Sequence, residues 1–145
     1  MATVKLSKFL DAMGFENLTP NVDMSGIRIT TPDVNRPALQ LTGYFQHFDK
    51  ERVQMVGYVE YTYLSSIPME RKLEIYKQYL QYEIPCTIFC SHAKPDKEFI
   101  NLANVYGRPV FYGCSIRLQN CEDIQRRRIG YGNSEIIKVL RCNGF

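Results

Sequence analysis

Apolar residues recur three or four positions apart in three stretches of the chain, which is the spacing of an amphipathic helix. The same stretches carry residues that begin and end helices. Ser66 and Pro68 suit the start of the second helix, and Gly14 and Gly107 suit the ends of the first and third. We therefore expect helices at residues 5–13, 68–82 and 95–107.

Four further stretches have the patterns of strands. Residues 26–31 and 52–60 alternate apolar and polar side chains, which predicts strands with one buried face. Gly57 marks a bend or a close contact in the second of these strands. Residues 85–90 and 109–112 are short apolar runs bounded by breakers, which is typical of strands covered on both faces.

The order of these elements indicates the fold class. The strand, helix and strand of residues 85–112 predict a right-handed crossover between two parallel strands. We expect a single-domain α/β sandwich with a mixed, partly parallel sheet.

The composition of the 145-residue chain, 45% hydrophobic and 23% charged, is that of a soluble globular protein. No apolar run approaches the roughly 20 residues that span a bilayer, and Lys5, Lys8 and Asp11 interrupt the N-terminal apolar positions, unlike in a signal peptide. Five cysteines without a C-x-x-C pair, and two histidines, do not predict a zinc site or a disulfide framework. We expect a cytoplasmic protein with no membrane partner and no metal site.

The net charge of +3 lies in the last residues of the chain. Residues 1–114 hold 12 basic and 12 acidic residues, whereas residues 115–145 hold 6 basic and 3 acidic residues. The cluster Arg126, Arg127 and Arg128 could meet phosphates, but a solvated, poorly ordered end is the simpler interpretation. Residues 1–114 do not suggest a nucleic-acid surface, so we expect no nucleic-acid partner.

The residues with reactive side chains do not combine into a catalytic pattern. Cys86 and Cys90 lie on one face of a strand that we expect to be buried, where an apolar environment raises a thiol pKa, so we interpret both as core. His92 follows the end of that strand, where sites of parallel sheets lie, and is a candidate ligand contact or general base. His47, in an apparent loop, is a weaker candidate. We predict no catalytic residue in this chain.

A polar and rigid segment lies between two prolines early in the chain. Arg36 offers a planar fork of donors, Asn35 offers an amide beside it, and Pro37 preorganises the turn that holds them. With His92, Asn35 and Arg36 form the predicted ligand-binding set, suited to a small anion. In the alternative interpretation, Arg36 pairs with Asp33 or another neighbouring acid, and Asn35 caps a helix that begins at Pro37.

One stretch near the end of the chain is similar to a phosphate-binding loop, which needs G-x-x-x-x-G-K-[ST]. The candidate loop residues are Gly130, Gly132, Asn133 and Ser134. Aligned on Gly132 and Ser134, the chain has Asn133 in place of the lysine and Arg127 in place of the first glycine. Asparagine has no positive charge and arginine cannot easily adopt the glycine backbone, so we do not expect a working nucleotide site.

Four segments of the chain resemble, in order, the N-terminal domain of bacterial HPr kinase/phosphorylase. The most specific part is the string from Asp33 to Pro37, followed by Leu39-Gln40-Leu41 and Gly43. The resemblance is collinear over roughly residues 4–112. The matching segments are residues 31–45, 51–64, 84–90 and 98–112.

The resemblance implies the following properties. Members of this family are cytoplasmic bacterial regulators of carbon metabolism that phosphorylate a serine of HPr, the phosphocarrier protein of the sugar phosphotransferase system. They use ATP or pyrophosphate, and they remove the phosphate by phosphorolysis. The chemistry resides in a C-terminal domain with an intact phosphate loop and magnesium. The N-terminal domain is an α/β module similar to the substrate-binding domain of the Mur ligases, and members are commonly hexamers.

We therefore divide the chain into an HPr kinase/phosphorylase N-terminal-like domain, residues 1–112, and a divergent basic tail, residues 113–145. The tail is either poorly ordered, an eroded remnant of the phosphate loop, or unrelated sequence from a truncation or frameshift.

The leading functional hypothesis is a non-catalytic regulatory module, without a cofactor of its own, that binds HPr, a small anionic ligand or copies of itself. One alternative is a part of an active ATP-dependent HPr serine kinase/phosphorylase whose catalytic domain is supplied elsewhere. The other alternative is an oligomerisation module that uses the Tyr-rich stretch at residues 58–64.

Overall fold

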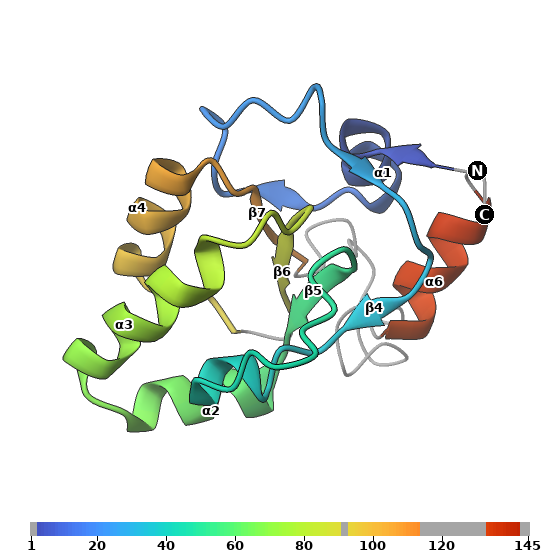
Figure 1. The fold of residues 1–145 in the computed structure, drawn as a ribbon. Coiled ribbons are helices and arrows are strands. Elements are labelled where there is room, and N and C mark those ends of the chain that lie inside the picture. Colours follow the sequence, from blue (N-terminus) through green and yellow to red (C-terminus); the bar gives the residue numbers. More distant parts are fainter. Residues whose placement is uncertain (1–2, 91–92, 114–132, 143–145) are drawn as a thin grey trace, which may run out of the picture.

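A computed structural model describes residues 3–90, 93–113 and 133–142 of the chain (Figure 1). In chain order the elements are β1 (Val4–Lys5), α1 (Leu6–Met13), β2 (Glu16–Asn17), β3 (Arg28–Ile29), β4 (Val34–Asn35), the short 3-10 helix η1 (Gln40–Thr42), β5 (Val53–Val56), α2 (Tyr58–Ser66), α3 (Met69–Leu80), β6 (Thr87–Phe89), α4 (Lys97–Tyr106), β7 (Val110–Tyr112) and α6 (Asn133–Cys142).

Five strands form the main sheet, in the order β2-β7-β6-β5-β4. The strands β4 to β7 run parallel, with Met55 opposite Ile88 and Ile88 opposite Phe111, whereas β2 pairs antiparallel with β7. The strands β1 and β3 pair antiparallel in a separate two-stranded sheet. The predicted parallel pair at residues 85–112 and the α/β fold with a mixed, partly parallel sheet are therefore confirmed.

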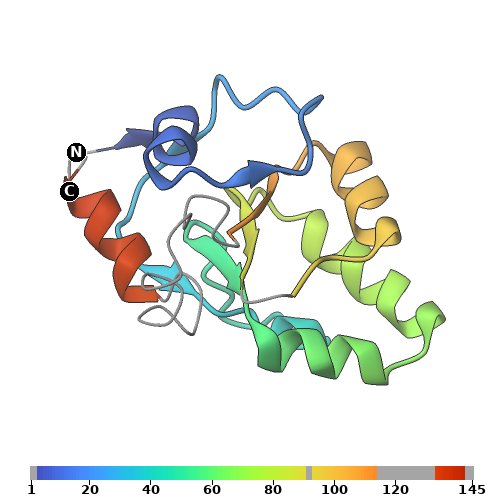
Figure 2. The same cartoon turned by 180° about the vertical axis from the view of Figure 1, so that it is seen from behind.

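Helices cover both faces of the main sheet (Figures 1 and 2). On one face, α3 and α4 pack against Val56, Phe89 and Val110. On the opposite face, α1 and α6 pack over Met55 and Ile88. Because successive residues of a strand point to opposite faces, strands covered on both sides need apolar residues at consecutive positions. This arrangement explains the continuous apolar runs that predicted β6 and β7.

The two cysteines of the β6 region belong to the core, as the sequence predicts. Cys86 is 0% exposed and Cys90 is 2% exposed. Burial raises the pKa of the Cys86 thiol, so this group packs as a neutral apolar side chain.

The three predicted helices are present as α1, α3 and α4. Gly14 and Gly107 end α1 and α4 with positive φ angles of 69° and 71°, which confirms both stop signals. Ser66, however, does not cap α3. It is the last residue of α2, its hydroxyl donates to the carbonyl oxygen of Tyr63, and Pro68 takes the N-cap position of α3.

The chain also leaves β5 earlier than the alternating pattern predicts. The strand expected at residues 52–60 ends at Val56, and the following residues form α2. The start of this helix is stabilised locally, because the Gly57 amide donates to Glu60 Oε2 at 3.1 Å. The strand expected at residues 26–31 is likewise shorter, since only Arg28 and Ile29 pair with β1.

Part of the basic tail belongs to the folded core. Residues 133–142 form α6, in which Ile136 and Leu140 are 0% exposed and join the apolar cluster of α1. Residues 114–132 and 143–145 lie outside the described part of the chain. The domain boundary after residue 112 stays a prediction. Among the described residues, no helix has the length and apolar character needed to cross a membrane.

Candidate functional site

The carboxyl ends of the parallel strands meet at one edge of the main sheet, which is where α/β proteins place their sites. Arg36 follows β4 and Gly57 follows β5 at this edge. The chain leaves β6 at Cys90, beside the same edge. The topology thus brings the segment of Asn35 and Arg36 to the edge where the loop after β6 begins. His92 itself lies outside the described residues.

An ion pair between Arg36 and Glu60 dominates this edge. Arg36 Nε donates to Glu60 Oε1 at 2.9 Å, and Arg36 Nη2 donates to Glu60 Oε2 at 2.8 Å. The Glu60 side chain is 5% exposed and that of Arg36 is 39% exposed. Two parallel hydrogen bonds fix the plane of the guanidinium as well as its distance from the carboxylate. The pair therefore ties the end of β4 to the first turn of α2.

The surroundings of Glu60 favour its charged form. Burial by itself would raise the pKa of the Glu60 carboxyl, but the hydrogen bonds from Arg36 and from backbone amides outweigh it and hold this pKa below its ordinary value. The same contact raises the pKa of Arg36. Glu60 also lies in the first turn of α2, where the helix dipole favours a negative charge.

Gly57 leaves the space that the guanidinium of Arg36 occupies. A Cβ atom at position 57 would overlap with Arg36 Nη2 and would lie 3.4 Å from Glu60 Oε2. The close contact that the sequence predicted for Gly57 is therefore present, although its cause is the arginine and not a bend within a strand.

Asn35 anchors β4 to β5. Its side-chain amide donates to Gln54 Oε1 at 2.6 Å. Gln54 is 0% exposed, and its own amide donates to the carbonyl oxygens of Asp49 at 2.9 Å and Arg52 at 2.8 Å. The interpretation of Asn35 as the cap of a helix beginning at Pro37 is thus wrong, since the first helical element after it is η1, at Gln40–Thr42, with Leu39 in the N-cap position.

The partner of Arg36 is not Asp33, which instead lies within hydrogen-bonding distance of Thr31. Arg36 pairs with Glu60, 24 residues later in the chain. Arg36 Nη1 has no partner among the described residues, so this nitrogen can still meet a ligand. Ligand binding by Asn35, Arg36 and His92 stays a prediction.

A cavity of about 200 Å³ lies near this edge, between α2, α3 and the start of α4. Tyr76 donates to Asp96 Oδ2 at 2.7 Å, and Lys72 Nζ lies 3.5 Å from the same oxygen. Asp96 Oδ1 caps α4 by accepting from the Phe99 amide at 2.9 Å. Burial, and then the contact with Asp96, raises the pKa of Tyr76, which keeps this phenol protonated. Asp96, Lys72 and Tyr76 of this cavity are thus engaged with one another, whereas Lys94, which also lines it, lies over the ring of Tyr112, 5.2 Å from its centroid.

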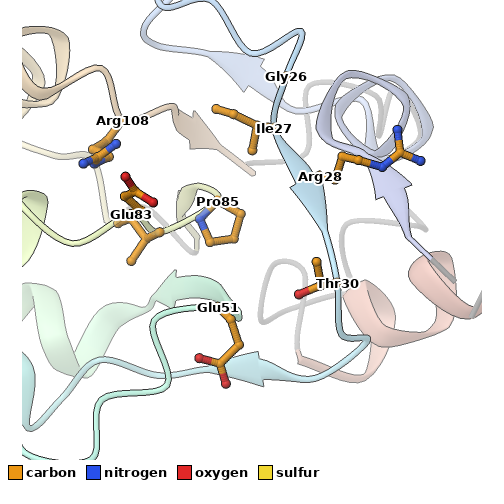
Figure 3. A pocket seen from close by; sticks show the side chains of 9 residues that line it. Gly26, Ile27, Arg28, Thr30, Glu51, Glu83, Pro85 and Arg108 are labelled. Atoms are coloured by element: carbon orange, nitrogen blue, oxygen red, sulfur yellow. The ribbon is translucent and has the colours of Figure 1, made fainter. Parts of the chain in front are cut away.

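A second cavity, of about 360 Å³, lies at the amino ends of the strands (Figure 3). Arg108 and Glu83 lie on one side of it and Arg28 on the other. Arg108 Nε donates to the carbonyl oxygen of Leu80 at 2.9 Å, and Arg28 Nε donates to Thr3 Oγ1 at 2.7 Å. The charged groups of this cavity do not converge on one point, so we do not assign a site to it.

The structure describes only part of the predicted phosphate loop. Nowhere in this part of the chain do three or more His, Cys, Asp or Glu side chains gather as metal ligands. Gly130 and Gly132 lie outside the described residues, and Asn133 and Ser134 begin α6. The degenerate phosphate loop at these four residues therefore stays a prediction.

The Tyr-rich stretch forms most of α2 and has an uncharged outer face. Tyr58 is 63% exposed, Val59 is 72% exposed and Tyr63 is 37% exposed. The sole charged residue of α2, Glu60, is buried. Oligomerisation through this face stays a prediction.

Comparisons with protein families and with individual proteins agree with each other. The family described as HPr Serine kinase N terminus matches residues 4–115. The HPr kinase/phosphorylase of Lachnoclostridium phytofermentans is 44% identical over 111 residues, which cover 77% of this chain and 36% of that protein. The HPr kinase/phosphorylase of Caldicellulosiruptor bescii is 35% identical over 72% of this chain and 34% of that protein, and that of Clostridium acetobutylicum is 32% identical over the same shares. The chain spans about a third of the length of these relatives.

A methyl group at position 57 should break the Arg36–Glu60 pair. We expect Gly57→Ala to lower the free energy of unfolding by about 1–3 kcal/mol, because the Cβ displaces the guanidinium from a buried carboxylate. Urea denaturation measures this change. Gly26→Ala is the matched control, since a Cβ there has no atom within 4 Å. Equal stability of the two variants would contradict the role that we assign to Gly57.

The stability contribution of Glu60 should depend on pH. Because its pKa is lowered in the folded state, this contribution is complete above the ordinary glutamate pKa of about 4.3 and is lost as the pH falls through the lower folded value. We expect the difference in unfolding free energy between the wild type and Glu60→Gln to shrink between about pH 5 and pH 3, measured by urea denaturation.

Glu74→Gln is the control for this pH series, because Glu74 pairs with Arg71 while 67% exposed. The difference in unfolding free energy between Glu74→Gln and the wild type should stay small over the whole pH range. A wild-type advantage over Glu60→Gln that is constant down to about pH 3 would contradict the lowered pKa.

Proposed function

The chain belongs to the HPr serine kinase N-terminal family, and from this membership we propose that it acts as a non-catalytic binding module of the HPr kinase/phosphorylase system. In this proposal the protein takes part in carbon catabolite regulation through the sugar phosphotransferase system of the bacterial cytoplasm.

The observation that carries the proposal is the extent of the match. Family similarity covers residues 4–115, and the chain spans about a third of each relative, from which we infer that the reaction of the longer proteins resides in a region that this match does not include. The described side chains at the carboxyl edge of the sheet favour binding over catalysis. The edge has a buried ion pair and a protonated tyrosine, and neither is a base poised to activate a serine hydroxyl.

Arg36 is the residue that we propose for contact with a small anion or with HPr. Its Nε and Nη2 are engaged with Glu60, which holds the guanidinium rigid and leaves the Nη1 side available. A guanidinium that is already oriented loses little conformational entropy when it binds a second acceptor. The cost is that Glu60 neutralises much of its charge, so we expect weak anion binding.

A second reading assigns the chain to an active ATP-dependent HPr serine kinase/phosphorylase whose catalytic domain is supplied elsewhere. ATP or pyrophosphate and magnesium would then belong to that other domain. The two readings differ in one measurable property, which is whether this chain alone transfers phosphate to HPr.

We expect the 145-residue chain to bind purified HPr without phosphorylating it. Mixed with HPr, ATP and magnesium, it should give no phosphoserine above a reaction without the chain, by intact-mass spectrometry. A titration followed by NMR should give saturable shifts in HPr. A full-length relative, such as the Lachnoclostridium phytofermentans protein, is the positive control. Phosphoserine formed by this chain alone would overturn the non-catalytic proposal.

Inorganic phosphate and AMP should bind at the carboxyl edge, with dissociation constants of about 1 mM. We expect Arg36→Ala to weaken this binding about tenfold or more, because Nη1 is the proposed contact. Calorimetric titration measures the affinity of each variant. Arg71→Ala is the control, since Arg71 is an exposed arginine that also pairs with a glutamate. Circular dichroism checks that both variants fold. Equal affinities of the wild type and Arg36→Ala would remove Arg36 from the site.

A further inference from the structure

The helix α6 completes the core from outside the region of family similarity. The match ends at residue 115, whereas α6 begins at Asn133. Even so, Ile136 and Leu140 are 0% exposed and belong to the same apolar cluster as Leu6 and Phe9. The region of family similarity therefore has an apolar surface, and α6, a helix from outside that region, packs on it.

This helix lies against α1 and β4 (Figures 1 and 2). Ile136 and Leu140 are four positions apart and so point to the same side of α6, with Val139 partly buried beside them. Lys138 and Arg141 are exposed on the other side. The surface between α1 and β4 thus fits an amphipathic helix with apolar anchors at i and i+4 and a basic outer face.

The contact with β4 connects this surface to the carboxyl edge of the sheet. β4 is an edge strand of two residues that pairs only with β5. Val34 packs against the cluster that contains Ile136, and two positions later Arg36 forms the pair with Glu60. A strand of two residues forms few backbone hydrogen bonds with its neighbour. Packing against α6 therefore contributes to keeping β4 in register with β5.

We propose that the apolar surface between α1 and β4 is a binding site for α6, and that α6, by occupying it, holds β4 and with it Arg36 in place. This proposal does not depend on the ligand or the partner of the carboxyl edge.

The first test asks whether α6 binds the apolar surface between α1 and β4 without a covalent link. A specific protease site is inserted between residues 122 and 123 of the full chain, and the folded protein is cut there. We expect the fragment with α6 to co-elute with residues 1–122 in size-exclusion chromatography at about 100 μM and to separate on dilution. Leu140→Asp should weaken the complex by about 100-fold or more, because it places a carboxylate in the apolar cluster.

Lys138→Asp is the matched control, since it introduces the same residue on the exposed side of α6 and should leave the complex intact. The proposal is overturned if the cut protein unfolds, if the helix leaves at every concentration, or if residues 1–122 pair with a second copy instead. Equal effects of the two substitutions would also overturn it.

The second test addresses Arg36 in the uncut chain. We expect hydrogen exchange of the amides at residues 34–36 to be about tenfold faster or more in Leu140→Asp than in Lys138→Asp, with the amides of β6 unchanged. Faster exchange throughout the sheet would mean general destabilisation, and unchanged exchange at residues 34–36 would mean that α6 does not hold β4. Either result would contradict the proposed coupling between α6 and Arg36.

Discussion

A single ion pair joins the end of β4 to the start of α2. Arg36 ends a two-residue edge strand, Glu60 lies in the first turn of α2, and Gly57, between β5 and α2, provides the space in which they meet. Burial of the Glu60 carboxylate has a desolvation cost. Two hydrogen bonds from Arg36 and a third from the Gly57 amide offset this cost. The pair therefore helps to fix the end of β4 against the first turn of α2 at the carboxyl edge.

Coverage of the sheet on both faces imposes the second constraint. The strands β5, β6 and β7 are buried at every position, so the side chains of one face must fit α3 and α4 while their neighbours fit α1 and α6. The few polar groups inside are paired: Tyr79 and Thr87 share a hydrogen bond of 2.8 Å, and Gln54 has three partners. Such a core leaves the edges and the outer helix faces as the places where function can vary.

The sequence could predict the elements whose apolar residues follow a regular pattern. In the helices α1, α3 and α4 these residues lie on one side, and in the strands β6 and β7 they form continuous runs, and so the α/β class followed. The helix α2 lacks such a pattern, because Tyr58 and Val59 are exposed while Glu60 is buried, which is the reverse of what an amphipathic pattern assumes. The site was predictable only in part. The chemistry of Asn35 and Arg36 was visible, but their partners Gln54 and Glu60 lie 19 and 24 residues away, where local pattern has no information.

The antiparallel strand β2 has a consequence for the way the chain assembles. Its neighbour β7 lies at the far end of the family-matched region, and the Val110 amide donates to Thr19 Oγ1 across 91 residues of sequence. The entropy of closing so long a loop must be offset before β2 gains any contact, whereas β5, β6 and β7 join through much shorter crossovers. On the ribosome, β2 is therefore made long before β7 and can take its place in the sheet only after β7 has emerged.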